Sequence, residues 1–316
     1  MNPQTPQGPA AIQIESTSRQ VLAHMPMDPS IRLHSVIALD GSDVRYQVVG
    51  VHREGEQCRV TVDVLDDPEM CVPKDRSPSS PGPAVHRVPS SDGVELTLHH
   101  LGGTGPALLI SHATGFHGLA YAPLARALGD NFDVWAIDLR GHGGSLPPAS
   151  GDFAWRGMAD DVTAAVARMG AAPIVGVGHS MGGAAILLAE LARPGLFEAA
   201  YLYEPIVLPP GFHVGGRENP MIEPARRRRP TFPSKKAALE RYASRPPLNQ
   251  LRLDSLAAYV EHGFVRTGEG AVRLACEPEH EAGTFGADDK VTFDDIHGLD
   301  LRLMVAAGAP EPGGGP

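Results

Sequence analysis

Residues 173 to 190 read Pro-Ile-Val-Gly-Val-Gly-His-Ser-Met-Gly-Gly-Ala-Ala-Ile-Leu-Leu-Ala-Glu. The apolar run at 174–177 predicts a buried strand, and the helix-period stretch at 184–191 predicts a helix. The turn between them, 178–182, places Ser180 between two glycines. At such a sharp strand-to-helix turn the neighbouring chain passes so close that only glycine fits at the flanking positions, while the serine hydroxyl stands clear of the backbone. We therefore interpret Ser180 as a nucleophile; the alternative is a glycine-rich turn that merely contains a serine.

The same turn points the N-terminus of the predicted helix at the place where negative charge would develop on a reacting carbonyl oxygen. A second source of backbone donors is the loop 112–118, which follows a predicted strand at 107–111. We predict that the N–H of Thr114 joins that of Met181 in an oxyanion hole. The site is then lined by His112, Gly115, Phe116 and His179, and for His112 a buried structural role is favoured over catalysis.

Strands and helices alternate after a β-hairpin predicted at 85–101. This alternation implies a mostly parallel sheet, and ligands of such sheets bind beyond the carboxyl ends of the strands. Asp138 and Arg140 follow one predicted strand, and we expect them to brace their loop by pairing with the backbone or with each other. Glu204 follows the strand predicted at 199–203. The other elements predicted here are a helix at 120–128, a strand at 134–137, a helix at 158–169 and a strand at 301–306.

The chain is expected to have four parts. The first contains strands at 31–39, 44–51 and 59–65 and ends in the linker Ser-Pro-Ser-Ser-Pro-Gly-Pro, but it shows no recognisable chemistry. Helices are predicted in the third part at 235–243, 255–263 and 276–282, as in a lid over the site. The four parts are an N-terminal extension (1–83), the first part of the core (84–208), a helical cap (209–290) and the continuation of the core (291–316).

Bulk composition limits the function. A formal net charge of −10 argues against a general nucleic-acid binder, and no apolar run approaches the roughly 20 residues that span a bilayer. The three cysteines are too scattered for a disulfide framework or a zinc site, and no secretory signal is visible. We therefore expect a cytoplasmic protein with no metal and no cofactor. The arginine run 226–229 is interpreted as a solvated face paired with glutamates; the alternative is attraction of acidic substrates or an anionic surface.

Three segments, taken in their order and spacing, resemble the α/β-hydrolase superfamily over roughly residues 85 to 308. They begin at His112 (His-Ala-Thr-Gly-Phe), Asp138 (Asp-Leu-Arg-Gly-His-Gly-Gly-Ser) and Gly178 (Gly-His-Ser-Met-Gly-Gly). The resemblance implies a sheet with helices on both faces, a helical cap and Ser180 as nucleophile. Dehalogenases and epoxide hydrolases of this superfamily carry Asp at the position of Ser180. Serine therefore implies acyl transfer with a small-molecule ester, thioester or related carbonyl substrate.

The resemblance also implies a catalytic carboxylate and a catalytic histidine. Glu204 fits the position after the sixth strand and Glu311 the position after the seventh, and Glu204 is preferred because Glu311 lies in a Gly/Pro-rich stretch. The histidine of the family follows an eighth strand, and no histidine after Ser180 matches it. The sequence thus resembles a hydrolase truncated before its last strand, last helix and histidine. The alternatives are a non-catalytic binding protein of the same fold, an inactive fragment, or a substitute base such as His179; the sequence indicates no oligomeric state.

Overall fold

The computed structural model describes residues 83–209, 219–268 and 270–308, together with the backbone of five strands nearer the N-terminus. Those five strands form an antiparallel sheet in the order β1-β2-β5-β4-β3. The sequence predicted three of them and missed β1 and β2. Their bounds are β1 (Ile14–Thr17), β2 (Gln20–Pro26), β3 (Val36–Ala38), β4 (Arg45–Glu54) and β5 (Gln57–Val64).

The chain divides into two compact units. The first consists of Met1–Ser80 with Leu239–Ala257, and the second of Pro81–Ala238 with Ala258–Pro316. The second unit holds a seven-stranded sheet in the order β15-β11-β10-β8-β9-β7-β6. Neighbouring strands from β15 to β9 run parallel, and β7 and β6 complete the sheet as an antiparallel hairpin. The strands are β6 (Ala84–Pro89), β7 (Glu95–Gly103), β8 (Ala107–Ser111), β9 (Asp133–Asp138), β10 (Ile174–His179), β11 (Phe197–Tyr203) and β15 (Arg302–Ala306).

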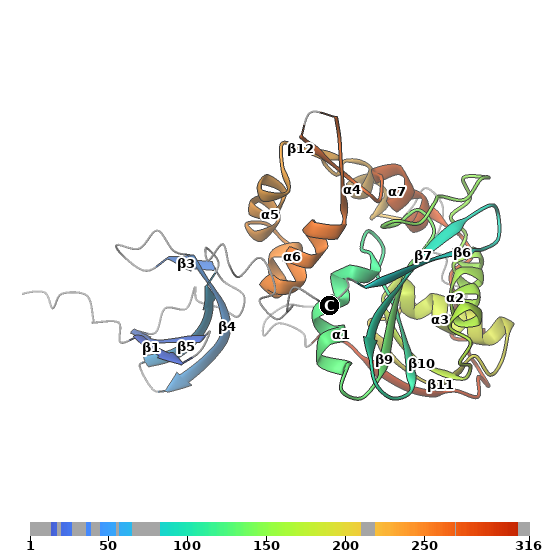
Figure 1. Ribbon diagram of the computed structural model, residues 1–316, viewed down its shortest axis with the longest axis horizontal. Helices are drawn as coiled ribbons and strands as arrows, with labels where there is room; N and C mark the ends of the chain where they lie inside the picture. Colours follow the sequence, from blue (N-terminus) through green and yellow to red (C-terminus); the bar gives the residue numbers. More distant parts are fainter. Residues whose placement is uncertain are drawn as a thin grey trace, which may run out of the picture. The chain divides into compact units, whose positions relative to one another are not determined.

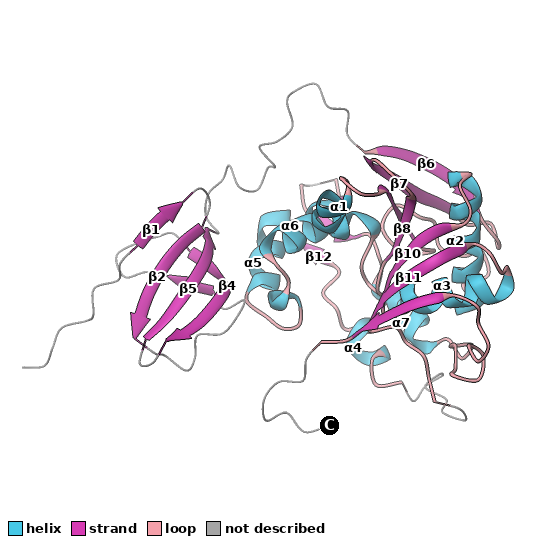
Figure 2. Ribbon diagram, turned by 90° about the horizontal axis from the view of Figure 1, so that it is seen from below, coloured by secondary structure: helices cyan, strands magenta, loops and turns pink. Residues whose placement is uncertain are grey.

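Helices cover both faces of this sheet, as Figures 1 and 2 show for α1 on one side and for α2 and α3 on the other. The first face packs Ala125 of α1 against Leu108 and Ile110 of β8. The second, larger core packs Met158 of α2 and Ile186 of α3 against the sheet. The mostly parallel sheet predicted from the alternation of elements is therefore confirmed. The helices are α1 (Ala122–Leu128), α2 (Trp155–Met169) and α3 (Met181–Ala192), and a short 3₁₀ turn, Gly118–Tyr121, precedes α1.

Residues 209–290, which lie between β11 and β15, are called the insert. It contains the predicted helices, and also a helix and a three-stranded antiparallel sheet, β12-β14-β13, that the sequence did not predict. Helix α4 packs on α7 through Ile222, Ala225 and Ala282. The elements are α4 (Ile222–Arg226), β12 (Thr231–Phe232), α5 (Lys235–Ala243), the 3₁₀ turn Leu248–Gln250, α6 (Leu253–His262), β13 (Phe264–Arg266), β14 (Val272–Leu274) and α7 (Pro278–Gly286).

Candidate active site

Ser180 occupies the turn between β10 and α3 with a φ of +53° and a ψ of −118°. A positive φ is strained for a residue with a Cβ, and such strain concentrates at functional sites. The close approach predicted at the glycines is present. A Cβ on Gly182 would lie 2.2 Å from the carbonyl oxygen of Ser111, and one on Gly178 would lie 2.5 Å from the Cα of Gly183. The glycines therefore let the turn close, and Ser180 itself is half-buried rather than packed in the core.

Backbone hydrogen bonds fix this turn. The Ser180 N–H donates to the Tyr203 carbonyl over 2.9 Å, and the Ser180 carbonyl accepts from Gly183 over 3.0 Å. Within the described residues, neither the Ser180 hydroxyl nor the Met181 N–H has a hydrogen-bond partner. A first-turn N–H without an acceptor is a donor available to a ligand. The turn thus offers a hydroxyl and a backbone donor side by side.

The loop 112–118 lies against this turn. The Thr114 hydroxyl donates to the Met181 sulfur over 3.4 Å, and the Phe116 N–H closes a tight turn onto the Ala113 carbonyl over 3.0 Å. The Thr114 N–H, like that of Met181, has no acceptor in the described part of the chain. On the other side of the loop, the Tyr121 hydroxyl accepts the Ala113 N–H over 3.2 Å. The two predicted backbone donors are therefore carried by segments in direct contact.

His179 belongs to the same group of contacts. Its Nδ1 lies 2.8 Å from the Tyr121 hydroxyl, and its ring packs against that of Tyr203 at 5.2 Å. Burial lowers the pKa of His179, and the nearby Glu204 carboxylate opposes this. His179 therefore lies between the loop and the end of β11, and no hydrogen bond joins it to the Ser180 hydroxyl. Sequence reasoning missed Tyr121, whose hydroxyl links the two segments.

His112 is fully buried, and both of its ring nitrogens are used. Nε2 accepts the Leu139 N–H over 3.0 Å, so Nδ1 carries the proton that it donates to the Ala113 carbonyl over 2.8 Å. Burial, with His142 nearby, lowers the pKa of His112 to about 3. A neutral imidazole with no available nitrogen cannot act as a base. The geometry agrees with the structural role favoured for His112.

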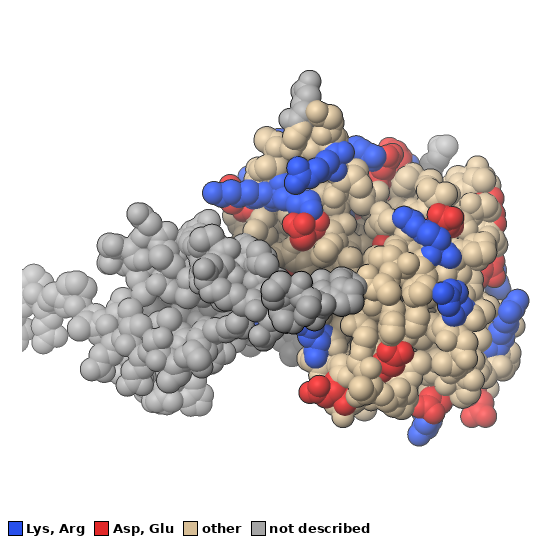
Figure 3. All heavy atoms as spheres, viewed as in Figure 1, with Lys and Arg blue, Asp and Glu red and all other residues tan. Residues whose placement is uncertain are grey.

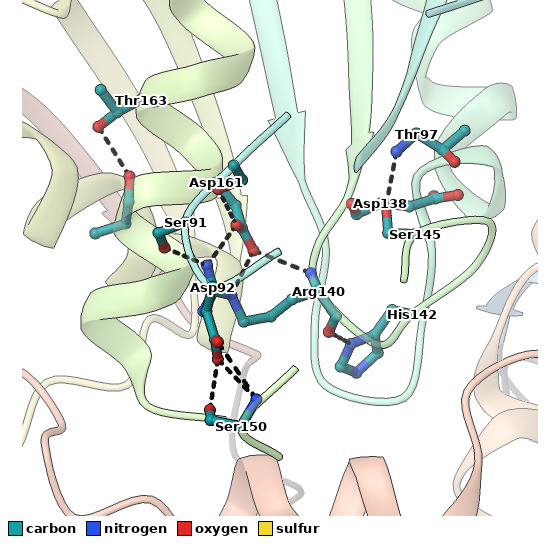
Figure 4. Close-up of polar contacts among 12 residues, drawn as sticks. Ser91, Asp92, Thr97, Asp138, Arg140, His142, Ser145, Ser150, Asp161 and Thr163 are labelled. Atoms are coloured by element: carbon teal, nitrogen blue, oxygen red, sulfur yellow. Dashed lines mark hydrogen bonds and ion pairs between the residues drawn. The ribbon is translucent and has the colours of Figure 1, made fainter. Parts of the chain in front are cut away.

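Figure 4 shows Asp138 at the end of β9 and Arg140, His142 and Ser145 in the loop that follows. The Asp138 carboxylate braces this loop. One oxygen accepts the Gly118 N–H over 2.7 Å, and the other accepts the Gly144 N–H over 2.8 Å and His99 Nε2 over 3.1 Å. Burial by itself raises the pKa of Asp138, but these donors, His99 above all, hold that pKa well below its usual range. A carboxylate with this many donors is a structural anchor.

Arg140 does not pair with Asp138. It forms a buried bidentate pair with Asp161 of α2 over 2.8 and 2.9 Å, and Asp161 also accepts the Arg140 N–H over 3.0 Å. The Arg140 side chain is 3% exposed and that of Asp161 is 0% exposed. The bracing predicted for this loop is present, but Arg140 finds its carboxylate on a helix rather than within the loop.

Glu204 follows β11 directly, with a φ of +46°. Its N–H donates to Ala306 of β15 over 2.8 Å, and its Oε1 accepts the Gly308 N–H over 3.0 Å. The residue is exposed. Glu204 therefore lies at the carboxyl ends of β11 and β15, the edge where a catalytic carboxylate was predicted. The competing candidate, Glu311, lies outside the described residues.

The arginines of the run 226–229 all have partners. Arg226 and Arg227 pair with Glu223, and Arg226 also pairs with Glu279. Arg229 lies 4.8 Å from the centre of the Phe232 ring. Figure 3 shows such basic side chains gathered over the insert, beside acidic ones. Arg228 pairs with Glu281, so three of the four arginines pair with glutamates as predicted; the Arg228 side chain is 21% exposed, against 46% for Arg226 and 80% for Arg227.

A small cavity of about 10 Å³ lies between the loop 112–118 and the insert, enough for about one water molecule. Its lining consists of Gly115, Phe116, His117, Gly143, Tyr259, Gly263, Leu274, Ala275 and Cys276.

In the part of the chain that the structure describes, no group of three or more His, Cys, Asp or Glu side chains is arranged to hold a metal. Among those same residues no helix is both long and apolar enough to cross a membrane.

Comparison with known proteins gives consistent matches. Residues 107–307 match a family model described as the alpha/beta hydrolase family. The mouse sn-1-specific diacylglycerol lipase ABHD11 is 34% identical over 119 residues, which are 35% of this chain and 37% of that protein. Human monoglyceride lipase is 32% identical over 149 residues, 45% of this chain and 49% of that one. The chain thus spans about a third to a half of the length of these curated relatives.

Solved structures with the same fold cover more of the chain. E-2-(acetamidomethylene)succinate hydrolase superposes with a TM-score of 0.56 at 21% identity, over 72% of this chain and 91% of that one. A thioesterase domain from the curacin biosynthetic pathway gives a TM-score of 0.55 at 19% identity, over 70% of this chain and 82% of that domain. At such identities the likeness concerns the fold alone.

Proposed function

Because the chain belongs to the alpha/beta hydrolase family, we propose that it hydrolyses small acyl substrates through a covalent acyl-enzyme on Ser180. The observation that carries the proposal is the geometry of this residue. It is half-buried at a strained φ and directly precedes Met181, which the Thr114 side chain contacts. The N–H groups of Met181 and Thr114 both lack acceptors within the described residues. Backbone donors of this kind stabilise the oxyanion of acyl transfer.

In the proposed reaction the Ser180 oxygen attacks the substrate carbonyl while a base takes its proton. The carbonyl oxygen, now negative, accepts hydrogen bonds from Met181 and Thr114. The base passes this proton to the leaving group, which departs. Water then attacks the acyl carbonyl while the base takes a proton from it, and that proton returns to the Ser180 oxygen as the carboxylic acid leaves. Relatives named as lipases support an ester as the substrate class.

The proposed reaction needs a base and a carboxylate that orients it. We assign the carboxylate to Glu204, supported by its place at the end of β11, with Glu311 as the second candidate. In the described part of the chain no histidine nitrogen contacts the Ser180 hydroxyl, and the Nδ1 of His179 is already hydrogen-bonded to Tyr121.

The free, buried thiol of Cys276 supports a reducing, cytoplasmic location.

Hydrolysis of p-nitrophenyl acetate and of an acyl thioester tests this proposal. The purified chain should release product faster than a Ser180→Ala variant of equal stability, because alanine removes only the nucleophile. Equal rates for both proteins would overturn the proposal.

Equal rates would instead favour a second candidate, a non-catalytic protein of the same fold that binds a small apolar ligand. The specific observation behind it is that, among the described residues, the Ser180 hydroxyl has no histidine partner. Such a protein should gain thermal stability from a fatty acid equally in its native and Ser180→Ala forms.

A further inference from the structure

The insert contacts the loop 112–118 mainly through Tyr259, whose carbonyl oxygen lies 3.0 Å from His117 Nε2 and whose hydroxyl also reaches the loop. The Tyr259 hydroxyl of α6 donates to the Gly115 carbonyl over 3.1 Å, and Arg228 Nη2 donates to the same hydroxyl over 2.7 Å. A guanidinium can only donate, so the hydroxyl accepts from Arg228 and its proton points to the Gly115 carbonyl. The orientation of this hydrogen bond is therefore set from the insert.

Arg228 is itself held in place. Its Nη1 forms an ion pair with the Glu281 carboxylate of α7, whose side chain is 9% exposed against 21% for that of Arg228. A carboxylate this buried is costly unless it is paired. The pair is neutral, so it is suited to fixing a neighbouring group rather than to attracting an anionic substrate.

The Arg228–Glu281 pair packs closely on Gly115. This residue has a φ of +77°, and a Cβ on it would lie 2.8 Å from Glu281 Oε1 and 2.9 Å from Arg228 Nη1. The Tyr259 ring packs against the rings of Phe116 at 5.0 Å and His117 at 5.7 Å. The contact is therefore a close fit between the insert and the loop.

Two planar peptide groups carry this contact to Thr114. The Gly115 carbonyl shares its peptide group with the Phe116 N–H, which donates to the Ala113 carbonyl over 3.0 Å. The Ala113 carbonyl in turn shares its peptide group with the Thr114 N–H. Because a peptide group is planar and rigid, fixing the Gly115 carbonyl restricts the direction of the Thr114 N–H.

We propose that Tyr259, oriented by Arg228 and Glu281, is a positioning residue that makes the oxyanion hole dependent on the insert. This inference rests on the proposed function, because it assigns Thr114 a role in the reaction. It adds residues that lie outside the loop and touch no reacting atom.

The test is a Tyr259→Phe variant, which removes the hydroxyl and keeps the ring that packs on Phe116 and His117. The first measurement is hydrogen exchange of the amides at 113–118. Loss of one hydrogen bond should speed their exchange by about five- to tenfold. The second measurement is the rate of Ser180 labelling by a fluorophosphonate over a range of reagent concentrations.

For labelling, we expect the maximal rate constant to fall about tenfold with unchanged affinity for the reagent, since the donor is misdirected rather than lost. Tyr201→Phe, at an exposed tyrosine of β11, is the matched control and should change neither measurement. An Arg228→Lys variant keeps the charge beside Glu281 but not the fork that serves two partners. Its effect and that of Tyr259→Phe should be less than additive in the double variant.

The outcomes separate this inference from the proposed function. Unchanged exchange in Tyr259→Phe would overturn the inference whatever the labelling shows. Faster exchange with an unchanged labelling rate would also overturn it, because the loop would then be held without being positioned for reaction. If the native chain does not label at Ser180, the proposed function fails, and the positioning role fails with it, even if hydrogen exchange shows that the insert holds the loop.

Discussion

Charged side chains are buried in one half of the carboxyl edge of the central sheet and exposed in the other half. At the end of β9, Asp138 and Arg140 are buried together with Asp161 of α2, and each forms several hydrogen bonds. At the end of β11, Glu204 is exposed. The buried half uses its charges to hold a loop in one shape, whereas the exposed half leaves its carboxylate accessible.

Reactive groups need positions where their atoms are not already used by other contacts. A carboxylate with every oxygen bonded to a donor, like Asp138, is unavailable to a base or a substrate. Ser180 and Glu204 lie on the less buried side, where side chains remain accessible. Removing charge from the buried half should therefore affect stability, and removing charge from the exposed half should affect activity.

The largest expected change is that of Arg140→Met. This substitution leaves the Asp161 carboxylate buried without its partner, which should lower the free energy of unfolding by about 3–5 kcal/mol in urea denaturation. The control is Arg227→Met, at a side chain 80% exposed, for which the loss should stay below about 1 kcal/mol. Similar losses for both variants would contradict a special role of the buried Arg140–Asp161 pair in stability.

Gly182→Ala should have the next largest effect. The added Cβ meets the Ser111 carbonyl oxygen at 2.2 Å, and the required shift should cost about 1–3 kcal/mol. Gly268→Ala is the matched control, because no atom lies within 4 Å of its added Cβ. Calorimetric melting of both variants checks this. A Gly182→Ala protein as stable as the control would show that the turn at Ser180 has more room than the structure gives it.

Stability should fall as the pH drops below about 6.5. Burial lowers the pKa of His112 to about 3 and that of His142 to about 4. These folded values lie below the unfolded value of 6.5, so the unfolded chain binds more protons in this window. Each histidine then contributes up to about 1.4 kcal/mol per pH unit. Below pH 3.8, protonation of Asp138 adds to the loss, because its folded pKa is also lowered.

Urea midpoints measured from pH 8 to pH 4 check this expectation. His142→Gln should reduce the slope of stability against pH, whereas His297→Gln, at an exposed residue, should leave it unchanged. A native slope of zero between pH 6.5 and 4 would contradict the burial of these imidazoles as neutral groups.

The smallest change in stability is expected for Glu204→Gln. The amide oxygen can still accept the Gly308 N–H, so the free energy of unfolding should change by less than about 0.5 kcal/mol. Hydrolysis should nevertheless fall by about tenfold or more, because a neutral amide cannot stabilise a protonated base. Unchanged hydrolysis would remove Glu204 as the candidate carboxylate and leave Glu311.

The sequence predicted the elements whose patterns are local. The strand 107–111 coincides with β8, and the glycines around Ser180 predicted a turn that the structure has. Helix α3 begins at Met181 rather than near 184, because Gly182 and Gly183 hide its helical period. The insert sheet was missed because β12, with two residues, and β13 and β14, with three each, are too short to show alternation.

What the sequence could not predict are partners far apart in the chain. Arg140 pairs with Asp161, 21 residues away on a helix, and nothing local distinguishes that partner from Asp138. Tyr259 reaches Gly115 across 144 residues. Within the arginine run, composition alone could not separate the partly buried Arg228 from its exposed neighbours. Such contacts depend on how elements pack, which periodicity does not specify.

The most direct test of the account is to find which residue of the native chain a fluorophosphonate modifies. Mass spectrometry of the digested, labelled protein should place the adduct on the peptide containing Ser180, and the Ser180→Ala variant should carry none. An adduct on other residues, or the same labelling in both proteins, would contradict the claim that the turn between β10 and α3 presents a nucleophile.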